Sequence, residues 1–387
     1  MKLLKHTKKL LADRDINIII GFFFLWRILL FIVAYYSTNF IPLRGKNFLG
    51  GGFDNYIKDP LFYGWANFDG EHYLSIAYMG YKGLEQAFFP VYPILMNALA
   101  RPFGSTIESL IVSGLLISNI SFLIALIILF KLITIDYPKS VAYLTITLLL
   151  VFPTSFYFGA LYSESLFLLL SVTSFYLMRK NMWFLASLLG VFSSGTRIFG
   201  MFLTPTFVIE AWQKKIKSRS YFWIIFIPLG LLGYMYYQWL SVGDPIAFYH
   251  LQKIVGPQHE SGIVLLPQVY FRYIKILLTT SISNPIFQTI ILEFLIGILF
   301  FILPLYGLLK KMRYSYVFYA LAGFLLPTIQ GSFSSVPRYV IVFFPSFLAL
   351  SLFLSNKSRF TRIIIFTISG LGLILETALF IRGYWIA

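Results

Sequence analysis

Long hydrophobic runs separated by short polar stretches dominate this chain. They lack the alternation of barrel strands, and most approach the 20 or so residues that a helix needs to cross a bilayer. We expect about eleven spans, at residues 16–36, 109–133, 140–158, 162–178, 182–196, 198–213, 220–241, 286–309, 314–332, 337–355 and 361–382. The pattern predicts an all-α polytopic membrane protein with one domain, 1–387.

The composition agrees with this interpretation and excludes a water-soluble enzyme. Of 387 residues, 58% are hydrophobic and 12% are charged, whereas a soluble domain carries about 25% charged residues. A disordered chain is excluded as well, because it combines low hydrophobicity with high charge. The sequence has no cysteine, which removes disulfides, thiolate nucleophiles and cysteine-ligated metals.

The basic residues predict how the chain is oriented. The net charge is +16, but the basic residues lie in short clusters between apolar runs, so we expect membrane orientation and no nucleic acid. With a cytoplasmic N-terminus, 19 of the 31 Lys and Arg residues fall in short inner loops. This balance requires a break at Arg197, with a segment on each side. The first apolar run lacks a cleavage pattern and is expected to be a retained span.

Two long outer segments result, 37–108 and 242–285, and they hold most of the acidic residues. Candidate chemistry therefore belongs on the outer, extracytoplasmic face. No internal repeat of the kind that marks two-halved transporters is visible.

The densest candidate region contains Asp69, Gly70, Glu71 and His72. A tight turn at Gly70 would aim both carboxylates at a divalent cation such as Mg²⁺ or Mn²⁺. Alternatively, one carboxylate acts as a general base, with His72 as a further titratable group. A solvated loop without a function is the third interpretation. The aromatic surroundings favour function, because charge at the membrane interface is costly.

Three more charged residues border apolar runs. Glu164 is either functional or an ordinary first-turn acid with Ser163 as the cap. Arg197 lies between two apolar runs and must be paired or bind an anion; pairing with Glu164 and holding a phosphate both stay open. Arg338 is a second outer arginine, whose ordinary interpretation is an interfacial flank with Tyr339 in the aromatic belt.

His250 and His259 match no common metal-site spacing, so a loop role is expected for both. No glycine-rich phosphate loop, HExxH or GxSxG motif occurs in the sequence, which disfavours nucleotide, zinc or serine hydrolysis.

Two acids inside predicted spans, Glu293 and Glu376, are left without an assigned role. Arg27 and Arg382 are candidate partners for them.

These motifs, in this order, resemble the glycosyltransferase-C superfamily, and within it the family of the second GPI mannosyltransferase and its prokaryotic relatives. The most specific matches are Asp-Gly-x-x-Tyr and Phe-Phe-Pro-x-Tyr-Pro. The matching stretches are 68–73 with Ala77, Gly80 and Tyr81; 87–93; 162–167; Thr196 and Arg197 with Gly200; Arg338 and Tyr339 with Phe344 and Pro345; and Gly243, Asp244 and Pro245 with Phe248. The chain departs in being short for a eukaryotic member, and family members differ at the position of Glu71.

The resemblance implies a glycosyltransferase-C-like architecture with a large first extracytoplasmic loop. It also implies mannose transfer from a polyprenyl-phosphate (dolichol-type) donor to an acceptor hydroxyl on a glycan, glycolipid or protein, with inversion to an α-linkage. The resemblance implies that Asp69 is the base and that Glu71 and His72 orient the base or the sugar. It implies that Arg197 and Arg338 stabilise the leaving phosphate, and that Glu164 holds Arg197 or binds the acceptor. Tyr73 and Tyr339 are implied to bind substrate. It implies a prokaryotic plasma membrane, or the endoplasmic reticulum in a eukaryote.

The main alternative is a transporter or flippase of a lipid-linked or amphiphilic substrate. Its charged groups would line a path through the bilayer, whereas an enzyme gathers them in one outer cavity. The long first outer segment favours the enzyme. A non-catalytic assembly subunit is a third possibility.

Overall fold

The computed structural model describes residues 13–216, 219–251, 254, 262–282, 284 and 286–386, and within these ranges the chain forms helices and no strands. By length and composition, five described stretches can cross a membrane: α2 (Arg14–Phe40), α7 (Ile107–Ile133), Tyr221–Val242, α17 (Phe287–Leu309) and α21 (Arg359–Ile381). A sixth is the bent pair Val336–Val342 and Phe344–Ser355, whose axes differ by 84°.

About eleven spans are therefore not shown by the described residues, because several predicted runs form broken or short helices. The shorter helices of the bundle are α8 (Lys139–Val151), α9 (Glu164–Arg179), α10 (Trp183–Thr196), α11 (Leu203–Gln213), α12 (Arg219–Ile224), α13 (Leu229–Val242), α18 (Tyr314–Thr328) and α20 (Phe344–Ser355). Hydropathy does not register helix breaks. The apolar run 140–158, for example, leaves the helix before Pro153, since the residue ahead of a proline avoids helical geometry.

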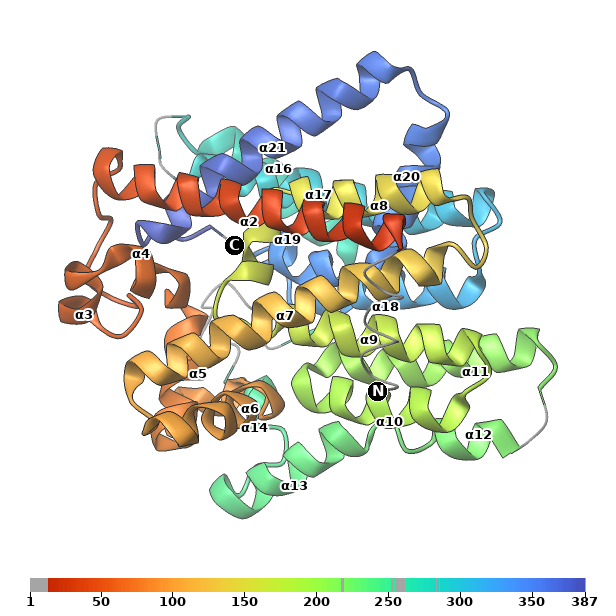
Figure 1. Ribbon diagram of the computed structural model, residues 1–387, viewed down its shortest axis with the longest axis horizontal. Helices are drawn as coiled ribbons and strands as arrows, with labels where there is room; N and C mark the ends of the chain where they lie inside the picture. Colours follow the sequence, from red (N-terminus) through yellow and green to blue (C-terminus); the bar gives the residue numbers. More distant parts are fainter. Residues whose placement is uncertain are drawn as a thin grey trace.

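Helix α9 lies at the centre of the bundle, with α7 and α10 as its main neighbours. Helix α13 in turn packs against α10 through Gly230, where an added Cβ would come within 2.0 Å of the Val191 carbonyl oxygen. On the other side, α20 packs on α8 and α21 packs on α2 (Figure 1).

The first outer segment forms a compact group of short helices at one end of the molecule (Figure 1). These are α3 (Phe53–Lys58), α4 (Pro60–Tyr63), η1 (Gly64–Ala66), α5 (Asp69–Met79), η2 (Gly83–Ala87), α6 (Val91–Ala100) and η3 (Arg101–Phe103). The end of α21 is fastened to this group: Tyr56 Oη donates to the Ile381 carbonyl at 2.6 Å, and Asn67 Nδ2 donates to that of Phe380 at 2.9 Å.

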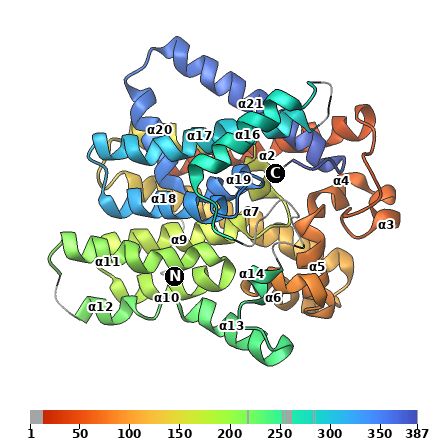
Figure 2. The same ribbon diagram turned by 180° about the vertical axis from the view of Figure 1, so that it is seen from behind.

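The remaining short elements are η4 (Ser155–Gly159), η5 (Ile198–Phe202), α14 (Ala247–His250), α16 (Leu266–Thr279), α19 (Val336–Tyr339) and η6 (Val340–Val342). Helix α14 packs against η2 beside α5 and α6, as the view from behind shows (Figure 2). Segments far apart in sequence thus meet at the end of the bundle that carries the first outer segment.

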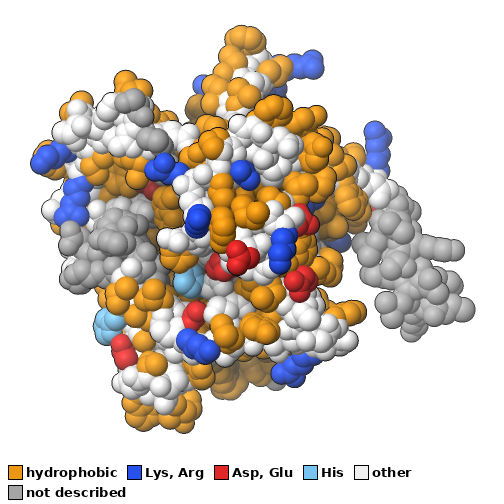
Figure 3. Space-filling model, turned by 90° about the vertical axis from the view of Figure 1, so that its left-hand side faces the viewer, with side chains coloured by type: hydrophobic (Ala, Val, Ile, Leu, Met, Phe, Trp, Pro, Cys, Tyr) orange, Lys and Arg blue, Asp and Glu red, His pale blue; other side chains and the backbone are white. Residues whose placement is uncertain are grey.

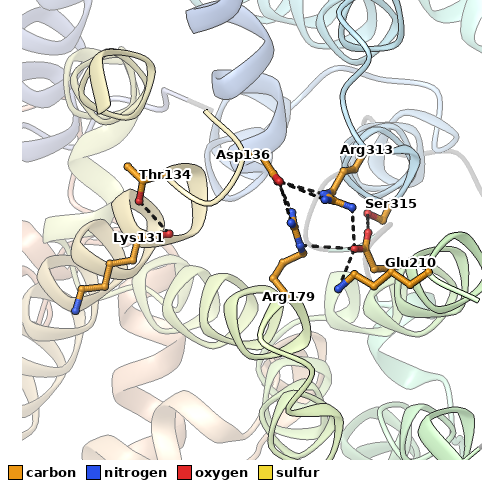
Figure 4. Close-up of polar contacts among 8 residues, drawn as sticks. Lys131, Thr134, Asp136, Arg179, Glu210, Arg313 and Ser315 are labelled. Carbon is orange, nitrogen blue, oxygen red and sulfur yellow. Dashed lines mark hydrogen bonds and ion pairs between the residues drawn. The ribbon is translucent and has the colours of Figure 1, made fainter. Parts of the chain in front are cut away.

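A group of charged side chains ties the bundle together at the far end of α9 (Figure 4). We call this the inner cluster: Asp136, Arg179, Glu210, Lys214, Arg313 and Ser315. Asp136 pairs with Arg179 and, at 3.1 Å, with Arg313. The buried Glu210 carboxylate contacts Arg313 at 3.1 Å and Ser315 Oγ at 2.7 Å. The inner cluster therefore links the α7–α8 connection to α9, α11 and α18.

Candidate active site

Four charged side chains form a continuous chain at the N-terminal end of α9, which we call the outer chain after the face that the sequence predicts for it. Arg338 Nη1 lies 2.6 Å from Asp69 Oδ2, and Arg338 Nε lies 3.6 Å from Glu164 Oε1. Arg197 Nη1 lies 2.5 Å from the same Glu164 oxygen. Acid and base alternate, so the formal charges cancel. Figure 3 views the face on which α3 to α6 lie and shows acidic and basic side chains among hydrophobic ones.

Asp69 owes its place to the start of α5. Phe68, directly before this helix, has a φ of 57°, a left-handed backbone that is strained for an aromatic residue. This kink presents the Asp69 carboxylate, 15% exposed, at the helix N-terminus. The expected turn at Gly70 is wrong: Gly70 lies within α5. Since residues two apart on a helix point to different sides, Asp69 and Glu71 diverge.

Arg197 lies at the break that charge balance predicted. Helix α10 ends at Thr196, Arg197 is extended with a φ of −154°, and the 3₁₀ turn η5 follows. The arginine also donates to Ser163 Oγ at 3.3 Å, and the Tyr73 hydroxyl lies 2.8 Å from the same oxygen. Ser163 occupies the N-cap position of α9, but its side chain does not cap the helix. The expected serine cap is therefore wrong, and the Arg197–Glu164 pair is formed.

Arg338 is not an ordinary interfacial flank, because its side chain is only 7% exposed. It lies in α19, within the first half of the sixth candidate span. Its guanidinium donates to the Tyr339 hydroxyl at 3.3 Å and lies 4.9 Å from the centre of that ring. Aromatic faces and two carboxylates thus hold this cation in place.

A cavity of about 160 Å³ opens beside the outer chain. Asp69, Tyr73, Arg197, Arg338 and Tyr339, all predicted site residues, line it, and Glu164 lies beneath with no exposed surface. Burial raises the pKa of Tyr73, so its hydroxyl stays protonated. Sequence reasoning gave no site role to several other lining residues, among them Phe89, Tyr249, Gln330 and Trp385. Phe89 belongs to the Phe-Phe-Pro-x-Tyr-Pro match, but nothing in the local pattern marks Tyr249 or Trp385, since aromatic residues are common at membrane interfaces.

Glu71 and His72 do not line this cavity. Glu71 accepts a hydrogen bond from the backbone N–H of Gly51, and burial raises its pKa to about 7. The His72 ring stacks on Phe88, with centres 4.7 Å apart. Their orienting roles stay predictions.

The residues present do not fit the predicted metal site. Asp69 pairs with an arginine, whereas Glu71 binds backbone on another side of the helix. Among the described residues, no group of three or more His, Asp or Glu side chains could hold a metal ion.

Four other charged or titratable residues of the sequence analysis, Asp244, His250, Arg27 and Arg382, have local partners. Asp244 lies 2.7 Å from His250 Nδ1, and this contact lowers the pKa of Asp244. His259 lies outside the described residues. Arg27 lies over the Trp65 ring at 4.4 Å, and Arg382 Nε donates to the Ile41 carbonyl at 2.7 Å.

A second, larger hollow of about 850 Å³ shares no lining residue with the first. It lies between the α5–α6 region and the pair α10–α13 and is lined mainly by apolar side chains, with Pro90 and Gly195 among its walls. The residues next to these two in sequence, Phe89 and Thr196, line the first cavity. The walls of the two hollows are thus neighbours in sequence at residues 89–90 and 195–196.

The sequence matches a protein-family model, described as Mannosyltransferase (PIG-V), over residues 10–222, more than half of the chain. The chain belongs to the PIG-V mannosyltransferase family. It is thus an integral multi-pass membrane protein. The match includes Asp69, Glu164 and Arg197, and it leaves Arg338 in the second half of the chain. No curated protein sequence matches this PIG-V family member.

Solved structures show a distant likeness. The apo form of the Archaeoglobus fulgidus oligosaccharyltransferase is 14% identical, with 94% of this chain and 56% of that chain covered at a TM-score of 0.45. A form in complex with Zn and sulfate is 15% identical, with 92% and 53% covered at 0.45. The same archaeal enzyme, AglB, in complex with an inhibitory peptide and a dolichol-phosphate is 12% identical, with 93% and 56% covered at 0.44. This PIG-V family member spans about half the length of these proteins.

Proposed function

We propose that this protein transfers mannose from a polyprenyl-phosphate donor to an acceptor hydroxyl on the outer face of the membrane. The observation that carries the proposal is one small cavity lined by a carboxylate, Asp69, and two arginines, Arg197 and Arg338. A base and a pair of anion ligands are what a phosphate-leaving glycosyl transfer requires. Family membership supplies the sugar.

The groups divide the reaction between them. Asp69 takes the proton of the acceptor hydroxyl as that oxygen bonds to the anomeric carbon of mannose. The bond from this carbon to the phosphate oxygen breaks, and its electron pair stays on the lipid phosphate. Arg338 and Arg197 stabilise the new negative charge in a site where little water screens it. A β-linked donor then gives an α-mannoside by one inverting displacement.

The apolar hollow supports a lipid-linked donor. In this proposal, the chain attached to a phosphate at Arg197 runs towards the hollow of about 850 Å³, whose wall includes Gly195, two residues away in sequence. An isoprenoid chain gains free energy by leaving water for such surroundings. A nucleotide sugar has no lipid chain that could occupy this apolar hollow.

The arrangement favours an enzyme over a transporter or flippase. Asp69, Arg338, Glu164 and Arg197 are joined by contacts of 2.5 to 3.6 Å around one outer cavity. A transport path would instead spread such groups along the bilayer depth. The acceptor is a glycan, glycolipid or protein, and the membrane is a prokaryotic plasma membrane or the endoplasmic reticulum.

A transfer assay with radiolabelled polyprenyl-phosphate mannose and host lipid extract tests the proposal. We expect wild-type membranes to produce a labelled mannoside, and Asp69→Asn to lose about 10³-fold or more in rate, because the amide cannot accept the proton. The Asn variant keeps the shape of the side chain, and Arg338 keeps the Glu164 carboxylate at 3.6 Å as a counter-charge, so most of the protein should remain folded.

The matched control is Asp54→Asn, which changes an exposed carboxylate of the same outer segment that does not line the cavity. It should transfer mannose at the wild-type rate. Full transfer by Asp69→Asn would refute the assigned base. Labelled donor that crosses the bilayer without forming a mannoside would instead support a flippase.

A further inference from the structure

Two buried side chains hold the connection between α18 and α19. The Tyr273 hydroxyl donates to Glu293 Oε2 at 2.5 Å and accepts from the Phe333 N–H at 3.1 Å. The same hydroxyl lies 3.2 Å from Ser332 Oγ. The Ser335 backbone N–H donates a further hydrogen bond to Glu293. Tyr273 and Glu293 are each about 5% exposed, so these hydrogen bonds are shielded from water.

This connection leads directly to the cavity. Ser335, at its end, lines the cavity and is the N-cap of α19. Its φ of 62° lies in the left-handed region that a serine adopts only when its surroundings impose it. The Arg338 backbone N–H donates to the Ser335 carbonyl at 3.1 Å. The position of Ser335 therefore fixes the backbone from which the Arg338 side chain extends.

From these contacts we infer that Tyr273 and Glu293 are positioning residues that aim Arg338 at Asp69; the inference rests on the proposed function. Neither residue lines the cavity. Each acts on the connection 332–335, and through it on the guanidinium that lies 2.6 Å from Asp69. A buried carboxylate in the apolar helix α17 costs free energy, and an apolar side chain would suffice if the position served packing alone. The positioning role explains why Glu293 occupies this position.

Kinetics of purified enzyme with radiolabelled polyprenyl-phosphate mannose test the inference. Tyr273→Phe keeps the ring and removes the hydroxyl, so we expect kcat to fall about tenfold while KM for the donor changes less than about twofold. Arg338 acts on charge that develops in the transition state, which is why kcat changes. Glu293→Leu should cost about 100-fold, and Glu293→Gln, which keeps an acceptor oxygen, should recover most of the rate.

Tyr270→Phe is the matched control. Tyr270 lies on the same helix and packs on the same Phe333 ring at 5.0 Å, as Tyr273 does at 4.9 Å. Its hydroxyl, however, donates to the Gly297 carbonyl of α17 at 2.9 Å. We therefore expect near wild-type kcat from this variant.

A second readout is independent of catalysis. Because the chain has no cysteine, a single Gln330→Cys substitution allows a spin label next to the connection. Tyr273→Phe should increase the mobility of this label, and Tyr270→Phe should not. Unchanged mobility in Tyr273→Phe, or equal kinetic losses in both tyrosine variants, would overturn the inference. If the wild type transfers no mannose, the proposed function fails, and label mobility still decides whether the two residues fix the connection.

Discussion

Each end of helix α9 carries a cluster of charged side chains. The two clusters contain similar residues but differ in whether they border a cavity. Glu164, its first residue, belongs to the outer chain, and Arg179, its last, belongs to the inner cluster; about 22 Å of helix separates them. Both clusters combine two acids with arginines at ion-pair distance. Only the outer chain, however, borders a cavity, and no member of the inner cluster lines either described hollow.

The difference shows that ion pairing alone does not identify a functional site. Apart from the pair of Glu210 with Lys214 along α11, the contacts of the inner cluster join one helix or connection to another, as expected of a structural tie. In the outer chain the same kind of contact leaves Asp69, Arg197 and Arg338 facing an open space. A cavity beside the charges, and not their burial, is what indicates chemistry.

The sharpest test of the comparison is one substitution made at both ends. Arg338→Lys keeps the charge but loses the planar fork that faces Asp69 and Glu164, so we expect mannose transfer to fall about 10³-fold. Arg313→Lys makes the same change in the inner cluster and should leave kcat near the wild-type value. Steady-state kinetics of both variants measure this. Equal losses would mean that the ends of α9 are coupled.

The next prediction concerns the folding free energy, which a substitution in the inner cluster should lower. Glu210 has no exposed surface and faces Arg313, Lys214 and Ser315. Glu210→Gln removes the counter-charge that Lys214 contacts and one of the two carboxylates that face Arg313, which we expect to cost about 3 kcal/mol of folding free energy. Thermal unfolding in detergent should show a lower midpoint, with kcat per folded molecule unchanged. A lost kcat at an unchanged midpoint would reverse the assignment of the two clusters.

The sequence predicted the helical class and the break at Arg197, whereas the outer location of segments 37–108 and 242–285 stays a prediction. It did not predict that several apolar runs are short or broken helices, because hydropathy averages over residues such as Pro153 and does not register where a helix ends. The predicted turn at Gly70 failed for a related reason. A glycine between two acids is typical of a turn, but here packing keeps it inside α5.

For the site, the charged members could be predicted because charge in an apolar setting stands out. Asp69, Glu164, Arg197 and Arg338 do meet, although more than 260 residues separate the first from the last. The aromatic lining could not be predicted in the same way: Trp385 and Tyr249 look like any interfacial aromatic residue. The positioning pair Tyr273 and Glu293 was missed because its meaning depends on a contact across 20 residues and two helices.

A smaller effect separates two acids by the sign of their pH dependence. Burial raises the pKa of Glu71 from 4.5 to about 7, and no cation contacts it among the described residues. Burial alone would also raise the pKa of Asp136, but Arg179 and Arg313 lower it to about 2. The folded state therefore holds a proton on Glu71 more tightly than the unfolded state does, and a proton on Asp136 less tightly.

Stability due to Glu71 should consequently fall by about 2 kcal/mol as the pH rises from about 4.5 to about 7, after allowance for partial exposure. Stability due to Asp136 is complete above pH 4 and is lost only as the pH falls towards 2. Unfolding midpoints at pH 5 and pH 7.5 test this with Glu71→Gln, which cannot ionise. The difference between wild type and variant should favour the wild type more at pH 5 than at pH 7.5. A difference that does not change with pH would contradict a raised pKa for Glu71. It would mean that the hydrogen bond from the Gly51 N–H keeps Glu71 ionised at both pH values.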